Sequence, residues 1–482
     1  MKLLFKILLF NFLFGISPII YNVSDINNSN QKNRDLVNNL ADDTIVDLRD
    51  GNNAIYVGTS GGISKIDLSS LSFSHFIDEN LPDGGNPATI TYDLNNGQTM
   101  IVVSGVLSYY SSAEDANIPY GTGIAWSIDS GENWFYTEQP KDELPECEDL
   151  GCVDPLDSPN NCECSPLASG CTWNVPSQTC SYQGSYIPFD WYGQTLFSNP
   201  ITVDEKNVTY DISVDTINEY IYIASWAGML RRLKYTDFQP NWELIPLPED
   251  INQVGDENQF LCGAINESSY VYNPVDNTGN NNHKVFSVHV EGNEIWAGTA
   301  NGVNKGIIGV DNCIDWIHYS SINSSLMKDW VIDIVQQDLI NNQKRIWLIA
   351  RDVVSPPIPH GITYTDNAGA DWVYIENIFN GENALIYNFY FDGSDAYAAT
   401  DRGLFVCDTS SDMLEWTEIY IPNDCYDDTE LVYSHIKNND IHFVGTANGL
   451  IFNSSTCPSH VDECGIGWCG VNYINLDFSN LG

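Results

Sequence analysis

Two short motifs in the sequence have the residue types and spacing of chemical sites. Gly58-Thr-Ser-Gly-Gly62 matches the Gly-x-Ser-x-Gly pattern, in which a strained turn exposes a nucleophilic serine. That turn must lead from a strand into a helix, whereas here the apolar residues of another strand follow. Related stretches of the chain place Ala300, Ala447 or Asp401 at the position of the serine. We therefore interpret the motif as a turn between two strands and predict no nucleophile there.

The second motif consists of Cys457, His460, Cys464 and Cys469, a spacing that could bind zinc. The chain contains 13 cysteines, and in an exported protein disulfides explain such a number better than metal ligands. We therefore predict no metal and no cofactor. An odd total leaves at least one thiol without an intramolecular partner. Six cysteines crowd one segment and predict a disulfide-linked insert: Cys147, Cys152, Cys162, Cys164, Cys171 and Cys180.

Charge and the first residues indicate where the chain acts. It has 65 acidic and 19 basic residues among 482, a net charge of −46, which would repel a phosphate backbone and argues against nucleic-acid binding. Residues 1–20 begin with lysines and continue with apolar residues, a pattern typical of a secretory signal peptide. Residues 21–40 form a polar N-terminal segment. We expect a secreted or cell-surface monomer with no membrane span after the signal.

An internal repeat runs through the rest of the chain and predicts its fold. The stretches 54–63, 294–303 and 440–450 share an apolar strand, a Gly-Thr pair and a tight turn that ends in glycine. Counting looser copies, the unit recurs about every 45–50 residues, the size of a four-stranded propeller blade. Seven points are equivalent: Thr59, Ser104, Ser225, Thr299, Ala350, Thr400 and Thr446. We predict an all-β fold, a single seven-bladed β-propeller over residues 41–482. Its last strand comes from Tyr473–Phe478 or from the N-terminal segment.

A second pattern, Ser/Thr-x-Asp/Asn-x-Gly-x-x-Trp, occurs twice in phase with the repeat. The two copies consist of Ser127, Asp129, Gly131 and Trp134, and of Thr365, Asn367, Gly369 and Trp372. The pattern resembles the Asp box, or BNR repeat, of sialidase-type and sortilin-type propellers. The Gly-Thr repeat is similar to the extracellular propellers of some bacterial sensor proteins. The resemblance implies that the box is a structural turn, remote from any active site.

The sialidase resemblance also implies a catalytic set that can be looked for. Those enzymes hold a carboxylate sugar with three arginines and use a tyrosine nucleophile with a glutamate, and an aspartate as acid/base. Only seven arginines are present: Arg34, Arg49, Arg231, Arg232, Arg345, Arg351 and Arg402. The early arginine motif is missing, Arg345 falls on a predicted strand and Arg402 in a turn. We therefore predict no catalytic residues and a protein that is not an enzyme.

The irregular segments point to a binding surface. Residues 106–120 lie between strands 2 and 3 of the second blade, the insert 141–203 follows that blade, the loop 248–284 follows the third, and residues 352–360 lie in the fifth. By propeller geometry all four segments emerge on one face, where loops on a rigid scaffold carry function. They bring aromatic residues suited to sugar stacking or protein contacts: Tyr109, Tyr110, Tyr120, Trp173, Tyr182, Tyr186, Trp191, Tyr192, Tyr270 and Tyr272. Alternatively, these aromatic residues only pack the inserts onto the propeller.

Three functional hypotheses follow. We favour a non-enzymatic module that recognises an extracellular protein or glycan. The first alternative is a glycan-processing hydrolase or lyase, which would require carboxylates from several blades to converge in the central funnel. The second is a sensory ectodomain that acts through a partner. The sequence does not name the ligand.

Overall fold

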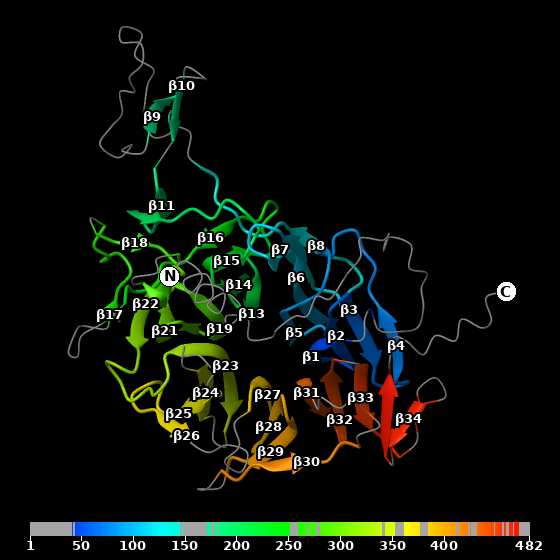
Figure 1. Cartoon of the computed structure of the whole chain (residues 1–482). Helices are drawn as coiled ribbons and strands as arrows, with labels where there is room; N and C mark the ends of the chain where they lie inside the picture. The colour runs from blue at the N-terminus through cyan, green and yellow to red at the C-terminus, as the bar shows by residue number, and fades with distance from the viewer. Residues whose placement is uncertain are drawn as a thin grey trace, which may run out of the picture.

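The computed structural model has seven antiparallel sheets arranged as blades around a central axis (Figure 1). It describes residues 41, 44–144, 147, 171–174, 179–182, 184–250, 259–267, 269–275, 280–339, 343–351, 361–375, 384–410, 414–422, 425, 431–447, 449–455, 457–458, 462–465 and 467–471. The predicted signal peptide (1–20), polar segment (21–40) and loop 352–360 lie outside these ranges. None of the helices in the described part is long and apolar enough to cross a membrane.

The first three blades contain four strands each, which pair in chain order. Blade 1 comprises β1 (Ile45–Gly51), β2 (Ala54–Thr59), β3 (Gly62–Asp67) and β4 (Ser72–His75). Blade 2 comprises β5 (Thr89–Asp93), β6 (Thr99–Ser111), β7 (Ala116–Ser127) and β8 (Phe135–Thr137). Blade 3 comprises β13 (Thr209–Asp215), β14 (Tyr220–Ser225), β15 (Met229–Lys234) and β16 (Trp242–Leu244).

The next three blades repeat this order, and blade 4 gains an outer strand. Blade 4 comprises β19 (Val285–Glu291), β20 (Glu294–Thr299), β21 (Gly302–Ile308) and β22 (Ile314–Tyr319), with β17 (Gln259–Phe260) outside β22. Blade 5 comprises β23 (Trp330–Asp338), β24 (Lys344–Arg351), β25 (Gly361–Thr365) and β26 (Val373–Ile375). Blade 6 comprises β27 (Ile386–Asp392), β28 (Asp395–Thr400), β29 (Gly403–Asp408) and β30 (Thr417–Ile419).

Among the described residues, blade 7 is built from consecutive C-terminal strands and closes the ring against blade 1. It comprises β31 (Val432–Asn438), β32 (Ile441–Thr446), β33 (Gly449–Asn453) and β35 (Trp468–Val471), with β34 (Asp462–Gly465) outside β35. β35 thus takes the place for which the sequence offered Tyr473–Phe478 or the N-terminal segment, both of which lie outside the described ranges. β1 packs against β31 and β32, and a shared apolar cluster that includes Leu48 and Phe443 holds the junction together.

Each Gly-Thr repeat ends strand 2 and starts the turn into strand 3. In blade 1, the Thr59 hydroxyl donates to the Gly62 carbonyl (2.8 Å) and accepts from the Gly61 N–H (3.1 Å). The glycine before it has no room for a side chain, because a Cβ on Gly58 would lie 2.6 Å from Thr89 Oγ1. Strands β2 and β3 lie on both sides of the Gly58–Gly62 motif, which confirms that it is a turn and not a nucleophile elbow.

The two Trp-bearing motifs close the turns between strands 3 and 4 of blades 2 and 5. The Ser127 hydroxyl accepts from Gly131 N–H (2.9 Å), and the Asp129 carboxylate accepts from Asn133 N–H (2.9 Å). Burial acts to raise the pKa of Asp129, but these and neighbouring hydrogen bonds together hold it below its ordinary value. Trp134 is buried against Phe76, with ring centroids 5.5 Å apart.

The blade 5 motif has the same geometry with an amide in place of the carboxylate. Thr365 Oγ1 accepts from Gly369 N–H (2.9 Å), and Asn367 Oδ1 accepts from Asp371 N–H (2.9 Å). Trp372 is buried edge-on to Trp296, with ring centroids 6.1 Å apart. Both motifs therefore form hydrogen-bonded turns with a buried tryptophan. They lie on the face of the disc opposite the turns that join strands 2 and 3. We call these the 3–4 face and the 2–3 face.

Candidate functional site

The insert that follows blade 2 leaves and returns at the 2–3 face. Asp142 receives a hydrogen bond from Ile201 N–H (2.8 Å) and its own N–H donates to the Ile201 carbonyl (2.7 Å). The same carboxylate pairs with Arg231 of β15 at 2.7 Å, and both side chains are almost fully buried. The two ends of the insert are thus fixed to each other and to blade 3.

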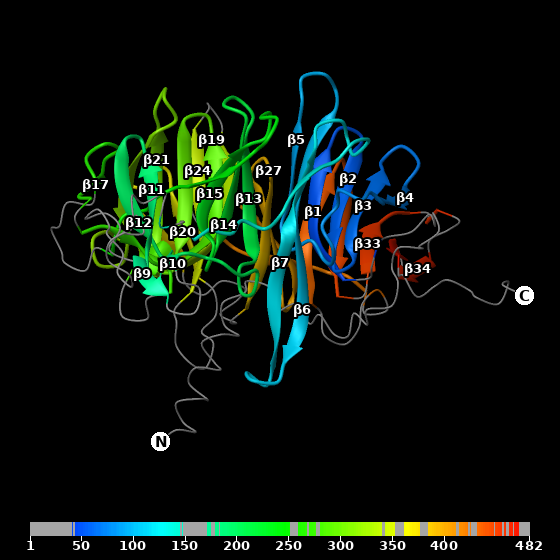
Figure 2. The same cartoon turned by 90° about the horizontal axis from the view of Figure 1, so that it is seen from above.

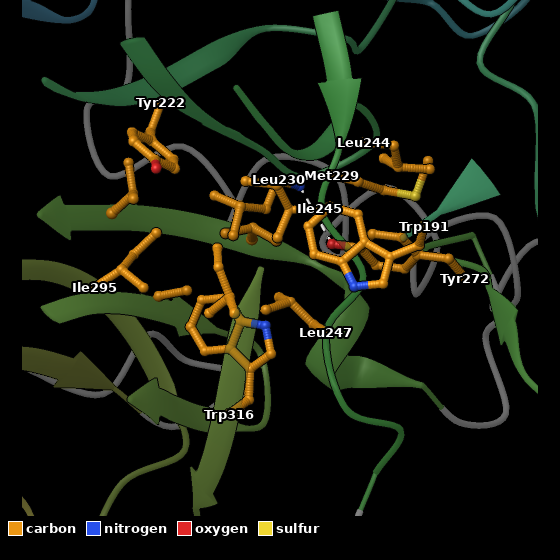
Figure 3. Close-up of a cluster of buried hydrophobic side chains, with 14 of the residues drawn as sticks. Trp191, Tyr222, Met229, Leu230, Leu244, Ile245, Leu247, Tyr272, Ile295 and Trp316 are labelled. Atoms are coloured by element: carbon orange, nitrogen blue, oxygen red, sulfur yellow. Dashed lines mark hydrogen bonds between the residues drawn. The ribbon is translucent and has the colours of Figure 1, made fainter. Parts of the chain in front are cut away.

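Between these ends, the hairpin β11 (Ile187–Trp191) and β12 (Gln194–Ser198) packs on the rim of blades 3 and 4. Trp191 is 1 % exposed and lies over the guanidinium of Arg232, whose carbon is 5.4 Å from the ring centroid. Figure 3 shows Trp191 beside Leu244, Ile245 and Tyr272 in the cluster between these blades. The hairpin is therefore part of the hydrophobic core.

Arg232 links the β11–β12 hairpin to the 3–4 turn of blade 4, on the opposite face of the disc. Its guanidinium donates to Glu243 (2.6 Å), to the Asn312 carbonyl (2.6 Å) and to the Tyr192 hydroxyl (2.9 Å). The Tyr192 hydroxyl donates in turn to the Asp311 carbonyl (2.8 Å). Since residues 311–312 form the turn between β21 and β22, the insert reaches from the 2–3 face along the rim to the 3–4 face.

The loop 248–284 follows the same path. Near its start and end, Asn282 of the 3-10 helix η2 (Asn281–His283) donates to the Pro248 carbonyl (2.8 Å). In between, β17 pairs with β22, and a disulfide joins Cys262 to Cys313 next to the 3–4 turn of blade 4. β18 (Val271–Tyr272) then pairs in parallel with β12 of the insert. Both segments thus leave and return at the 2–3 face, but between their ends they run along the rim, where the apolar surface of blades 3 and 4 holds them.

This path divides the ten predicted ligand-contacting residues. Trp191, Tyr270 and Tyr272 are buried, so they pack the inserts onto the propeller and cannot contact a ligand in this arrangement. Tyr186 and Tyr192 are exposed, although the Tyr192 hydroxyl is engaged as described. Trp173 and Tyr182 belong to the hairpin β9 (Cys171–Asn174) and β10 (Thr179–Tyr182), of which the backbone pairing is described. Tyr109, Tyr110 and Tyr120 lie together on blade 2.

The blade 2 residues belong to a long hairpin that projects from the 2–3 face. β6 and β7 pair from Ile101–Ser127 out to Ser111–Ala116, and Figure 2 shows their tip extending well beyond the neighbouring blades. Tyr109 is 45 % and Tyr110 62 % exposed. The rings of Tyr109 and Tyr120 lie 6.1 Å apart on one side of the hairpin. An exposed aromatic surface on a two-stranded arm is suited to contact another molecule.

The base of this hairpin is joined to the returning end of the insert. Lys206 N–H donates to the Pro119 carbonyl (2.8 Å), and Gly121 N–H donates to the Asp204 carbonyl (3.3 Å). Lys206 also pairs with Glu114 at the hairpin tip (3.0 Å). These contacts support the arm from one side and leave its tip and its other side exposed.

Carboxylates dominate the charge around the hairpin. Burial, followed by the charges of Asp83, Asp204 and Glu205, raises the pKa of Tyr120. The Tyr110 hydroxyl is bonded to Asp115, and this hydrogen bond, together with the carboxylate charge, raises the pKa of Tyr110. The surface therefore combines tyrosine rings with a negative potential, which favours a cationic partner.

Eight of the described cysteines form four disulfides, in agreement with the prediction that the cysteines serve mainly as disulfides. Cys147 pairs with Cys171 within the insert, Cys425 with Cys464, and Cys457 with Cys469. The last two pairs use three of the four residues of the zinc-like motif. Cys152, Cys162 and Cys164 lie outside the described ranges, and of Cys180 only the backbone in β10 is described. Cys407 is a free, buried thiol whose pKa is raised to about 11, mainly by burial.

The structure also brings together carboxylates that the sequence analysis did not single out. Asp47, Asp211 and Asp333 lie on the innermost strands of blades 1, 3 and 5. Burial lowers the pKa of Arg49, but the charges of these three carboxylates outweigh burial and raise it. Burial raises the pKa of Asp211 to about 8, and the charge of Asp333 adds to the shift. Burial raises the pKa of Asp333 to about 6, although the Arg49 charge opposes it.

Two of these carboxylates serve as links between adjacent blades. Asp47 accepts from Thr89 N–H of blade 2 (3.2 Å), and Asp211 accepts from Val288 N–H of blade 4 (2.8 Å). The sequence held a usable signal, because each aspartate stands between two apolar residues just before a copy of the repeat: Val46-Asp-Leu48, Tyr210-Asp-Ile212 and Ile332-Asp-Ile334. An isolated acidic residue inside an apolar strand is costly to bury without such bonds.

Solved structures align with most of this chain at low sequence identity. Neither the protein-family models nor the curated proteins contain a match. A solved structure described as YCF48 bound to D1 peptide aligns with a TM-score of 0.40 and 10 % identity, over 91 % of this chain and 96 % of that one. The β-propeller domain of Cps50 (Swd1) from Myceliophteria thermophila aligns with a TM-score of 0.43 and 9 % identity, over 85 % and 95 %. The function must therefore be inferred from the residues and the structure of this chain.

Proposed function

We propose that this protein is a non-enzymatic recognition module that acts outside the cell or on its surface and binds a partner protein through the β6–β7 hairpin. The observation that carries the proposal is the hairpin itself, a two-stranded arm that projects from the disc and exposes Tyr109 and Tyr110. A propeller needs only a short turn between strands 2 and 3, as in blade 1, so the extension has no role in closing the blade.

The described disulfides support the extracellular part of this proposal, because structural disulfides persist in oxidising compartments. The two Trp-bearing turns have the hydrogen bonds that an Asp box would make, and we infer that they are of that type. A glycan ligand and a sensory role through a partner are the alternatives on the same surface, since tyrosine rings also stack on sugars.

The test compares ligand capture by three forms of the mature protein. In the first variant a two-residue Asn-Gly turn joins Val106 to Gly121, which removes the arm and keeps blade 2. The control variant, Phe238→Ser, removes an aromatic residue that is 97 % exposed in the 3–4 turn of blade 3. We expect surface proteins captured by the wild type to be lost with the shortened hairpin and kept with the control. Glycan-array binding that survives shortening would contradict the proposal.

The alternative function, a glycan-processing hydrolase, would need carboxylates from several blades to act as an acid/base pair. Asp211 and Asp333 have pKa values raised to different extents, as an acid/base pair requires. Turnover of a panel of chromogenic glycosides that disappears in both Asp211→Asn and Asp333→Asn would establish it. We expect no turnover by the wild type, because Asp211 is engaged by Val288 and Ile212.

A further inference from the structure

The hydrogen-bonding pattern of the β6–β7 hairpin shows which backbone groups point outward. In an antiparallel pair, alternate residues direct their N–H and C=O away from the partner strand. Val106 does so, because it exchanges hydrogen bonds of 2.9 and 3.1 Å with Gly85. Ser108 and Tyr110 follow at two-residue intervals in an unbroken register, so their N–H and C=O groups point to the same outer edge of β6.

Nothing in the described part of the chain pairs with this stretch of edge. The backbone bonds along β6 stop at Gly85–Val106, and none of the outward groups of Ser108 or Tyr110 has a backbone partner there. The opposite edge, on β7, has fewer free backbone groups. Pro119 presents no N–H, and its carbonyl already accepts from Lys206. The two edges of one hairpin therefore differ in their capacity to pair with another strand.

The residues of the free edge also lack the usual protection. Exposed edge strands are normally blocked by proline or by lysine, which discourage pairing with other chains. The segment Leu107–Ser111, Leu-Ser-Tyr-Tyr-Ser, contains neither. It is rich in residues that favour strands, and the Tyr109 and Tyr110 side chains stand on its two faces. An added strand would therefore gain both backbone hydrogen bonds and aromatic contacts.

The charge around the edge defines the side chains that such a strand would carry. Five acidic residues surround the hairpin, namely Asp83, Glu114, Asp115, Asp204 and Glu205. Lys141 and Lys206 oppose them, and each of these lysines is already paired with a carboxylate. Lysine and arginine side chains on an added strand would meet both these carboxylates and the faces of the tyrosine rings.

We propose that the free edge of β6, from Leu107 to Ser111, is a docking site at which an extended, lysine- or arginine-rich segment of a partner protein adds as a further β-strand. This inference rests on the proposed recognition function and specifies how the hairpin performs it. Main-chain bonds to Ser108 and Tyr110 would provide the affinity, and the tyrosines and carboxylates would select basic side chains in alternating positions.

A proline placed at one outward position tests the site directly. Ser108→Pro removes an N–H that points out of the hairpin, so the bonds between β6 and β7 remain. Asn117→Pro is the matched control, because Asn117 lies opposite Tyr110 and presents its N–H on the other edge. The probe is a labelled peptide of about ten residues that alternates valine and lysine, a typical strand length or somewhat longer. A second peptide has glutamate for lysine, and a third is N-methylated at alternate residues.

We expect the lysine peptide to bind the full-length wild type in fluorescence anisotropy. Ser108→Pro should raise the Kd of this peptide by up to about tenfold, which corresponds to the loss of the one hydrogen bond that the Ser108 N–H would donate. Asn117→Pro should leave the Kd within about twofold of the wild-type value, which is a change close to zero in the free energy of binding. The glutamate and N-methylated peptides should not bind. Thermal unfolding of both proline variants verifies that they are folded.

Equal weakening by the two proline variants, or undiminished binding of the N-methylated peptide, would overturn strand addition at this edge. Sedimentation of the wild type as a dimer that Ser108→Pro dissociates would show that the occupant is a second copy, and would also overturn it. Partner proteins that are lost on shortening the hairpin but retained by Ser108→Pro would leave the recognition function standing and reject only this mode of binding.

Discussion

Two hairpins of this protein both carry aromatic residues but place them in opposite environments. β6–β7 holds Tyr109 and Tyr110 out in solvent, whereas β11–β12 buries Trp191 between blades 3 and 4. The β11–β12 hairpin has a complementary surface within reach, made by Arg232, Tyr272 and the adjoining strands. β6–β7 extends away from the disc, beyond any such surface (Figure 2). An aromatic loop is thus a binding element only where its own fold leaves it unsatisfied.

The largest expected effect comes from the buried hairpin. Trp191→Ala should lower the free energy of unfolding by about 3–5 kcal/mol, because it removes a fully buried indole and leaves a cavity. Denaturant unfolding measures this loss, and ligand capture by the fraction that remains folded should not change. A variant that keeps full stability but loses its partner would place the binding site on β11–β12 and reverse the comparison.

The second prediction concerns the tryptophans of the two Trp-bearing turns, which lie on the 3–4 face. Trp134→Ala should destabilise by about 3 kcal/mol, since its ring packs against Phe76 in the core between blades 1 and 2. Trp372→Ala should behave alike in blade 5. Binding measured alongside unfolding separates the two effects, and loss of binding without loss of stability would make the turn a site.

A third prediction concerns pH and the buried carboxylate of Asp211. The pKa of Asp211 rises from 3.8 to about 8 on folding, so between these values the folded state holds a proton that the unfolded chain has lost. Stability of the wild type should therefore fall as pH rises from about 4 to about 8, by at most about 1.4 kcal/mol per pH unit.

In Asp211→Asn this part of the slope should vanish, since the amide oxygen still accepts the Val288 N–H without titrating. Thermal unfolding of both proteins across the pH range measures the difference. Identical pH profiles would contradict the raised pKa. A change in partner binding would show that Asp211 affects binding by the β6–β7 hairpin.

The smallest expected change in stability lies on the projecting hairpin. Tyr110→Ser should alter the free energy of unfolding by less than about 0.5 kcal/mol, as exposed substitutions usually do. It should nevertheless weaken partner binding, measured in the same capture assay, because exposed tyrosines commonly dominate interfaces. A substitution that leaves binding intact would mean that the backbone edge, and not the aromatic face, is recognised.

The sequence predicted the architecture well because its signals are local. Strand, Gly-Thr and turn follow one another within ten residues, and the Trp-bearing turns are stabilised by residues no more than seven apart. The course of the inserts depends on contacts over long separations, such as Tyr192 with Asp311, for which no local pattern exists. The clustering of Asp47, Asp211 and Asp333 likewise requires the closed ring, although their apolar neighbours were visible.

The closing of the ring has a mechanical consequence. In the described chain each blade is made from consecutive residues, and β1 meets β31 without a strand in common, so this junction is bridged by side-chain packing and by bonds such as that from Asn438 to Asp50 (3.1 Å). We therefore expect the contact between blades 1 and 7 to separate before any single blade unfolds. Hydrogen exchange should be fastest, among the inner strands, at β1 and β31. Circular permutants cut between other blades would keep every sheet while moving this junction around the ring.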